Sequence, residues 1–438
     1  MNFPTARRWR AALAFTGLLL LASCGTPPAP APSTDGTPLP HWNTPRVAVG
    51  ETVNVAGNVQ YIAMQFNDLP DWNRQPFAGS LASFHNSCRR LSYNAQWTAL
   101  CGIAARVPLT DQAARAFFEQ YFTPWSVSQN GQLAGTVTGY YEPGLSGSLT
   151  ATSQAKFPIY GVPYDFVSVP YSSGKRSGTV RIRATGNNSG VVDANGSYTA
   201  NLSEFPITER TRALKGRFAG NRFVPYYTRA EINAGALNGK APILAYADDP
   251  VELFFLQVQG SGRLITPDGH SVRLAFADKN DFPYVSIGRY MANRGYLPLS
   301  NTDMPSIKNW LRDNPAKLAE VLGQNPSFVF FRKLPDDHDN GPSGALGVPL
   351  SAGFSAAVDK HHITLGSPLF VATTDPRNGR ALNRLVMAQD TGSAITGGVR
   401  VDFFWGYGAE AGTFAGKMKH PGYVWTLLPN GQLPRHQP

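Results

Sequence analysis

Two aspartates near the C-terminus, Asp390 and Asp402, have the sequence setting that best suits acid chemistry. Asp390 follows the apolar run 384–388 and precedes a glycine-containing turn, and Asp402 stands between Val401 and Phe403. A carboxyl group among apolar neighbours loses solvation, which raises its pKa. A general acid that works near neutral pH needs such a pKa. The pattern favours acid–base chemistry, although a turn cap and a surface aspartate are the structural alternatives.

Motifs for other kinds of chemistry are missing from the sequence. It contains no HExxH, no cysteine pair at metal-ligand spacing and no phosphate-binding loop. The segment 260–262 is Gly-Ser-Gly, which is not a nucleophile elbow. His361 and His362 are adjacent, and adjacent residues of a strand point to opposite faces. We therefore expect neither a metal nor a cofactor.

Several blocks around the aspartates resemble the membrane-bound lytic murein transglycosylase A family. The C-terminal region is similar to the family's three-aspartate domain, whose three positions match Asp359, Asp390 and Asp402. The chain departs from many relatives at Ser393, where they have a second glycine, and in a polar insertion at 165–203. The remaining blocks occur in the family's order and extend the resemblance over roughly residues 50–430: they are 139–143, 254–262, 325–331 and 408–412.

The resemblance implies a fold that is mainly β with flanking helices. In that fold a double-psi β-barrel catalytic domain carries an inserted second β-barrel-like domain, with a groove between them. The expected domains are 49–140 with 335–430 for the catalytic part, whose three-aspartate region is about 340–430, and 141–334 for the insertion.

The resemblance also implies the reaction and the roles of the aspartates. A lytic transglycosylase cleaves the β-1,4 bond between N-acetylmuramic acid and N-acetylglucosamine and leaves a 1,6-anhydromuramic end. Asp402 matches the single catalytic acid and base, because the sugar's own C6 hydroxyl is the nucleophile. Asp390 is expected to orient the turn or to couple electrostatically to Asp402. Asp359 is expected to be structural.

Aromatic and amide side chains in the matching blocks are candidates for contacts with sugar. Tyr140 and Tyr141 are expected to stack on sugar rings, with core packing as the alternative for one of them. If 254–262 is a strand, every second side chain shares one face. That face would line the groove with Gln257, Gln259 and Ser261.

Two other functions stay open at this point. A non-catalytic murein-binding outer-membrane lipoprotein would need a groove but no acid. A water-using muramidase would need a second carboxylate, for which Glu142 and Glu410 are the candidates. The chemistry of the new chain ends, anhydro or reducing, distinguishes the muramidase from the lytic transglycosylase.

The N-terminus has the features of a bacterial lipoprotein signal. Three arginines precede an apolar run at 11–21, which is too short for a permanent membrane span. The sequence Leu-Ala-Ser-Cys then ends at Cys24. We expect 1–23 to be removed, Cys24 to be lipidated and the proline-rich 24–48 to be a tether. Gly25 after the cysteine favours the outer membrane, with the protein facing the periplasm.

The remaining cysteines and the charge fit this compartment. In an oxidising periplasm, Cys88 and Cys101 are expected to form a disulfide rather than remain free. The formal net charge of +10 indicates an anionic partner. The compartment favours peptidoglycan glycan strands with acidic stem peptides over nucleic acid. The lipid makes the outer membrane a further partner, and murein synthases are possible protein partners that no segment identifies.

Periodicity and turn residues predict the elements that position these groups. Helices are expected at 81–91, 97–106 and 111–122, with Thr110 as an N-cap, and at 284–294 and 307–322, with a break at Pro315. Strands are expected at 135–141, 179–183, 273–276, 327–331, 369–372, 384–388, 400–405 and 422–428.

Overall fold

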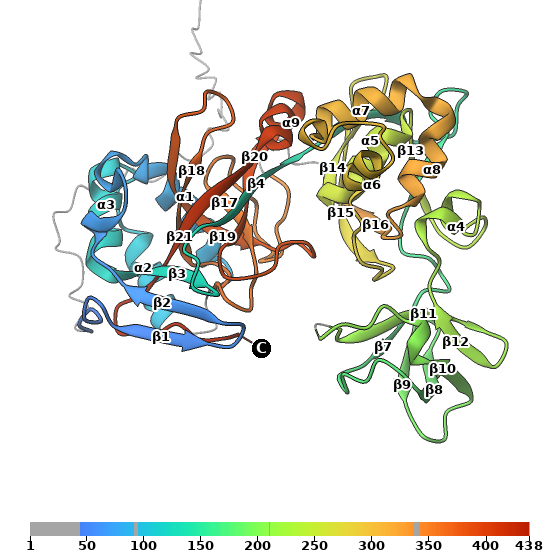
Figure 1. The fold of residues 1–438 in the computed structure, drawn as a ribbon, viewed down its shortest axis with the longest axis horizontal. Helices are drawn as coiled ribbons and strands as arrows, with labels where there is room; N and C mark the ends of the chain where they lie inside the picture. Colours follow the sequence, from blue (N-terminus) through green and yellow to red (C-terminus); the bar gives the residue numbers. More distant parts are fainter. Residues whose placement is uncertain (1–43, 92–94, 210, 336–340, 438) are drawn as a thin grey trace, which may run out of the picture. The chain divides into compact units, whose positions relative to one another are not determined.

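The computed structural model describes residues 44–91, 95–209, 211–335 and 341–437 (Figure 1). In this part the chain is mainly β with flanking helices, as expected. Cys24, the signal segment and most of the tether lie outside the described residues. At the expected end of the tether, Val47 packs against a buried core and Arg46 lies over the Phe66 ring.

One sheet holds both candidate acids, and its strands run in the order β1-β2-β3-β21-β18-β19-β17-β20-β4. Because β4 pairs with β21 as well as with β20, the strands from β21 to β4 close into a barrel. This ring corresponds to the barrel expected for the catalytic domain. The bounds are β1 Thr52–Val55, β2 Val59–Ala63, β3 Phe122–Gln129, β4 Gly135–Glu142, β17 Ser355–Val358, β18 Pro368–Thr374, β19 Ala381–Asp390, β20 Arg400–Tyr407 and β21 Lys419–Pro429.

Strand alternation decides which side chains fill this barrel. Val137, Val401 and Phe403 belong to its buried core. Their neighbours along the strands therefore point to the opposite face. On that face Tyr140 and Phe404 form part of a separate, smaller apolar cluster. The outward face of β4 and β20 is thus the face that carries Asp402.

Three helices from the N-terminal part of the chain form a layer in which α1 packs on β19, and α2 and α3 pack on α1 (Figure 1). They are α1 (Phe77–Cys88), α2 (Ala95–Ala104) and α3 (Asp111–Tyr121), and a disulfide joins Cys88 to Cys101 across α1 and α2. The Thr110 hydroxyl caps α3 by accepting from the Ala113 amide at 3.3 Å. A fourth helix, α9 (Gly408–Lys417), follows β20 and packs on β4.

The polar segment 165–203 builds most of a second, closed barrel. It supplies β7 to β10, and residues beyond 203 complete the ring as β11 and β12. This barrel has its own core, in which residues such as Ile182, Leu214 and Phe223 are buried. The bounds are β7 Val167–Pro170, β8 Thr179–Gly186, β9 Ser189–Val192, β10 Tyr198–Asn201, β11 Ala213–Ala219 and β12 Arg222–Pro225.

A third sheet has the order β16-β15-β14-β5-β13-β6. Helix α5 packs against this sheet and helices α6 to α8 share a core with α5. The bounds are β5 Gly144–Ser148, β6 Phe157–Tyr160, β13 Ile243–Ala247, β14 Ser261–Ile265, β15 Ser271–Lys279, β16 Val329–Lys333, α4 Arg229–Asn233, α5 Pro250–Gln259, α6 Ile287–Asn293, α7 Met304–Asp313 and α8 Leu318–Gly323.

The prediction of a strand over 254–262 was wrong, because most of this block is helix α5. Asp249 caps the helix by accepting from the Val251 and Glu252 amides, and Pro250 occupies its first turn. Gly260, with φ of 82°, ends the helix in the left-handed conformation that glycine adopts freely. Successive helical residues are turned by about 100°, so Gln257 and Gln259 do not share a face.

Candidate active site

Strand pairing fixes the position of Asp402. In the parallel register of β20 and β4, Asp402 lies opposite Thr138. On its other side, Asp402 lies opposite Ala357 of β17 in antiparallel register. Val401 and Phe403 fill the barrel core, so the aspartate between them is turned to the outer face, where it is half-buried.

Asp390 reaches the same region through an irregularity in the parallel pairing of β19 with β17. Ala356 pairs with Ala388 and the next residue, Ala357, pairs with Asp390, so Gln389 is an extra residue in the ladder. The Gln389 side chain is buried and donates to the Ser87 hydroxyl at 3.0 Å, which ties it to α1. Asp390 consequently flanks Ala357 on one side, and Asp402 flanks it on the other.

Asp402 has one hydrogen-bonded oxygen and one free oxygen. The Thr138 hydroxyl donates to Oδ1 across 2.6 Å. Oδ2 has no hydrogen-bond partner among the described residues. It is also absent from the solvent-inaccessible polar atoms that lack a partner, so this oxygen is accessible. Burial raises the pKa of Asp402 above its ordinary value, while the Thr138 hydrogen bond and the charge of Arg400 oppose that rise. The group can hold a proton and present it on an accessible oxygen.

Both oxygens of Asp390 are occupied. Oδ1 accepts from the Ala345 amide at 2.8 Å and from the Thr391 amide at 2.9 Å, and Oδ2 accepts from the Tyr140 hydroxyl at 3.1 Å. Burial raises the pKa of Asp390 to about 6, although these three donors favour its ionised form. The nearby charge of Asp402 adds to the rise. Asp390 therefore holds two loops and Tyr140, and each of its oxygens already accepts from a protein donor.

Asp359 lies at the end of β17 and ties down backbone. Its Oδ2 accepts from the Gly397 amide at 2.7 Å, and its Oδ1 accepts from the His361 amide at 3.1 Å. The side chain is buried. These contacts connect the turn after β17 to the segment before β20, so Asp359 helps to set where β20 begins.

The two tyrosines point to opposite sides of β4. Tyr140 packs against Phe404 with ring centroids 5.1 Å apart and is only 8% exposed. Tyr141 is 4% exposed, but it lines a pocket with Met304 and Lys308 of α7 and Gly412 of α9. Neither ring is an open platform for stacking on a sugar, and Tyr141 is the one with a pocket beside it.

The three polar residues predicted to line one face lie in separate environments. Gln257 is buried and accepts from the Arg229 guanidinium. Gln259 accepts from the backbone amide of Tyr141 at 3.1 Å, and Ser261 begins β14. Gln257 and Gln259 thus act here as internal hydrogen-bond partners.

The two glutamates considered for a water-using enzyme differ in setting. Glu142 is buried and accepts from Arg263 Nε at 3.1 Å, and Arg263 also lies over the Tyr407 ring. Burial raises the pKa of Glu142, while Arg263 and Arg273 oppose the rise. Glu410 is exposed in the first turn of α9. Glu142 is therefore committed to an internal ion pair.

Thr138 and Arg400 complete the surroundings of Asp402, and sequence reasoning missed both. Arg400 donates to the Thr138 hydroxyl oxygen at 2.8 Å. A signal for Thr138 existed, since it alternates with Tyr140 on the predicted strand and so shares its face. Its pairing with Asp402 depends on a parallel register between segments 264 positions apart, which no local pattern specifies.

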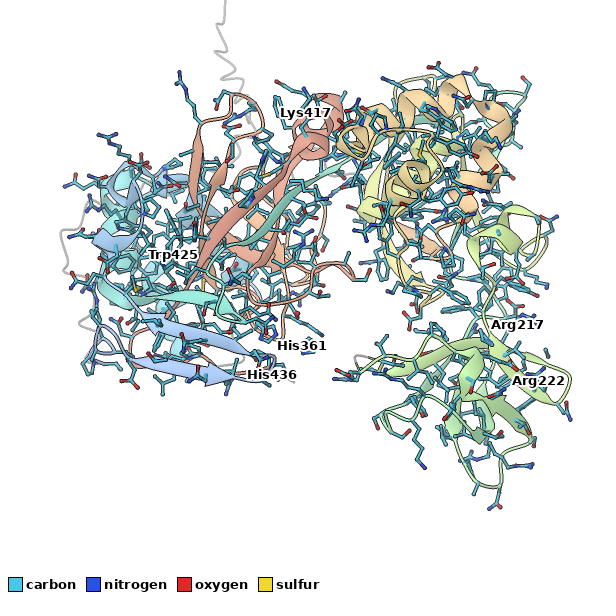
Figure 2. All side chains as sticks on the ribbon, in the orientation of Figure 1. Arg217, Arg222, His361, Lys417, Trp425 and His436 are labelled. Atoms are coloured by element: carbon cyan, nitrogen blue, oxygen red, sulfur yellow. A yellow bond between two sulfur atoms is a disulfide. The ribbon has the colours of Figure 1, made fainter. Side chains whose placement is uncertain are left out.

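The described residues contain no group of three or more His, Cys, Asp or Glu side chains that could hold a metal ion. His361 instead stacks on His436 near the C-terminus, with ring centroids 5.7 Å apart (Figure 2). As far as the structure describes the chain, none of its helices has the length and apolar character to cross a membrane.

Comparison with known proteins shows to which family this chain belongs. Residues 136–332 match the family described as "MltA specific insert domain", and residues 354–428 match "3D domain". The crystal structure of MltA from Neisseria gonorrhoeae is 56% identical; the alignment covers 93% of this chain and 100% of that chain, with a TM-score of 0.80. The chain belongs to the membrane-bound lytic murein transglycosylase A family.

Other members of the lytic murein transglycosylase A family are more distant. The Escherichia coli K12 protein named membrane-bound lytic murein transglycosylase A is 36% identical over 258 residues, which are 55% of this chain and 66% of that protein. The matched part of the chain spans 55% to 66% of the length of the first curated relatives. The structure of E. coli MltA with bound chitohexaose is 26% identical, covers 88% of this chain and 99% of that chain, and has a TM-score of 0.59.

Proposed function

We propose that the protein is a lytic transglycosylase that cleaves peptidoglycan glycan strands, with Asp402 as its only acid–base group. The observation that carries the proposal is the contrast between the two half-buried aspartates. Asp402 has an unoccupied Oδ2, whereas both oxygens of Asp390 accept hydrogen bonds. Only Asp402 is arranged to give a proton to a substrate and to take one back.

The reaction needs one carboxyl group used twice. Protonated Asp402 gives the Oδ2 proton to the glycosidic oxygen as the bond from C1 of N-acetylmuramic acid breaks. The C6 hydroxyl oxygen of the same sugar then attacks C1, and its proton passes to the carboxylate of Asp402. A 1,6-anhydro ring forms, the proton is returned and no water is consumed. The intramolecular nucleophile supplies the proximity that a second catalytic group would otherwise provide.

The positions of the other carboxylates support this mechanism over hydrolysis. A hydrolase uses a second carboxylate to activate water or to form a glycosyl-enzyme bond. Asp390 is occupied by three donors, and Glu142 is paired with Arg263. A non-catalytic binding protein would not require a half-buried carboxyl with a free oxygen.

The substrate proposal also has support from a relative. The structure of E. coli MltA holds chitohexaose, a β-1,4-linked sugar chain. We infer that this chain binds a glycan strand of the same linkage, and that Tyr141 contributes through the pocket beside α7 and α9. The anchor is proposed to be lipid on Cys24, which would hold the protein at the outer membrane facing the periplasm.

The chemistry of the new chain ends tests the proposal. Purified murein is digested in water enriched in ¹⁸O, and the products are analysed by mass spectrometry with and without borohydride. We expect ends that resist reduction, contain no ¹⁸O and are lighter than the hydrolysed product by one water. Reducible, labelled ends would show that the protein is a hydrolase. An unchanged murein profile would show that it binds murein without cleaving it.

A further inference from the structure

The hydroxyl of Thr138 stands between a cation and the candidate acid. It donates to Asp402 Oδ1 across 2.6 Å and accepts from Arg400 Nη2 across 2.8 Å. Arg400 is half-buried, and its Nη1 donates to the carbonyls of Val401 at 2.6 Å and Thr136 at 3.2 Å. Within the described part of the chain Arg400 makes no ion pair, and the hydroxyl of Thr138 is the group that joins it to Asp402 by hydrogen bonds.

The donor and acceptor inventory of these groups fixes the direction of the hydrogen bonds. A guanidinium can only donate, and a hydroxyl has a single proton. Because Arg400 donates to the hydroxyl oxygen, the proton of Thr138 points to its other neighbour, Asp402 Oδ1. Oδ1 is therefore held as an acceptor whether Asp402 is charged or neutral.

We propose that Arg400 and Thr138 are positioning residues that keep the transferable proton of Asp402 on Oδ2. When Asp402 is protonated, Oδ1 already accepts from Thr138, so the acid proton occupies the oxygen that has no protein partner. When Asp402 is ionised, the same hydrogen bond, polarised by Arg400, stabilises the carboxylate. The inference rests on the proposed function, and it adds two residues and a specific oxygen to it.

The pair also sets how readily Asp402 ionises. The charged or titratable groups that face Asp402 are Arg400 on its own strand, Tyr140 on β4 and Asp390 on β19. β17 contributes only Ala357 at this point. Removing the Arg400–Thr138 contact takes away groups that favour the ionised form. The acid should then stay protonated to higher pH and become a poorer proton donor in the first step.

The test compares Thr138→Val with Thr138→Ser. Valine keeps the shape and removes the hydroxyl, whereas serine keeps the hydroxyl. We expect Thr138→Val to lower kcat at least tenfold with KM within about twofold, and to move the pH profile of kcat to higher pH. Thr138→Ser should recover most of that loss. Thr179→Val, at an exposed position of β8, is the matched control and should leave both parameters unchanged.

Arg400→Met tests the relay. Because the hydrogen bonds from Arg400 reach Asp402 through Thr138, the loss in the double variant Thr138→Val with Arg400→Met should be clearly smaller than the combined losses of the two single variants. Additive losses, or a Thr138→Val enzyme with the wild-type kcat and pH profile, would overturn the inference. If Arg400→Met does not fold, the Thr138 series still decides.

Asp402→Asn is measured beside these variants. Active Asp402→Asn protein would refute the proposed function itself. Inactive Asp402→Asn with unaffected Thr138→Val would refute only the positioning role.

Discussion

The Tyr140 hydroxyl donates to Asp390 Oδ2 at 3.1 Å, and this contact binds the second aspartate of the site to the strand that carries Thr138. The Tyr140 ring in turn packs on Phe404, two residues after Asp402 on β20. Burial, together with the charges of Asp390 and Asp402, raises the pKa of Tyr140 well above its ordinary value, so the phenol remains a donor. Asp390 thus supports the site without competing for the proton that Asp402 transfers.

Asp402→Asn should abolish murein cleavage while leaving the fold intact. Asparagine keeps the shape and can accept from Thr138, but it cannot transfer a proton, so a loss of about 10²–10⁴-fold is expected. Release of muropeptides from purified murein measures it, and circular dichroism checks the fold. Glu410→Gln is the control, because Glu410 lies exposed on α9 and should be dispensable. Folded Asp402→Asn protein with near-normal turnover contradicts the assignment.

Asp390 should make the free energy of unfolding depend on pH. Its pKa of about 6 in the folded protein is above the ordinary value, so it stabilises the fold at low pH and loses that contribution as the pH rises through about 6. The effect is at most about 3 kcal/mol between pH 4 and pH 7. In urea unfolding, the free energy of unfolding of Asp390→Asn should therefore increase relative to that of the wild type as the pH increases. Tyr140→Phe removes a donor to the carboxylate. The pH at which Asp390 ionises, and with it the pH range over which stability is lost, should therefore be higher than in the wild type. A difference between Asp390→Asn and wild type that stays constant over this range would contradict the prediction.

Arg263→Met should destabilise the protein more than the loss of packing explains. It leaves Glu142 buried without its guanidinium partner, which typically costs about 3–5 kcal/mol. Glu142→Gln should cost less, and the double variant should be more stable than the sum of the two single changes predicts. Thermal and urea unfolding of the four proteins complete the cycle. Simple additivity would show that the pair is not coupled. Anhydro products from folded Glu142→Gln protein would further support the single-acid mechanism.

Cys24→Ala should release an active protein from the membrane fraction. Acyl chains would supply the membrane affinity, since each buried CH₂ contributes about 0.8 kcal/mol. Cell fractionation measures where the protein is found, and mass spectrometry of the N-terminal peptide shows whether it carries lipid. Retention of Cys24→Ala protein in the outer membrane would mean that another surface binds there.

The sequence predicted those elements whose pattern is local. The helix opening at Thr110 and the strands around 135–141 and 400–405 lie where the periodicity places them. The block 254–262 misled because a short apolar run suits a strand or a buried helix equally well. The signals that decide for helix were present, in the Asp249 cap, in Pro250 and in Gly260 after the last turn.

The acid itself was predictable and its supporting residues were not. Asp402 stands out because an ionisable group interrupts an apolar strand. Thr138 and Arg400 are ordinary strand residues whose role depends on which segments pair, and the extra residue Gln389 that presents Asp390 shows only in the paired structure. Burial of Tyr140 and Tyr141 likewise follows from tertiary packing.

The hydrogen bond between Thr138 and Asp402 joins segments 264 positions apart, and this has a consequence for the order of assembly. A chain that emerges from its N-terminus presents β4 early and β20 only near the end. Pairings of such long sequence separation form slowly, because the entropy of closing the loop must be met first. The barrel of β7 to β12 joins strands within 59 residues of one another and can form before the C-terminal strands arrive. Murein-cleaving activity should therefore arise in a single late step, when the last strands insert. Shortened chains that end before β20 should not cleave murein.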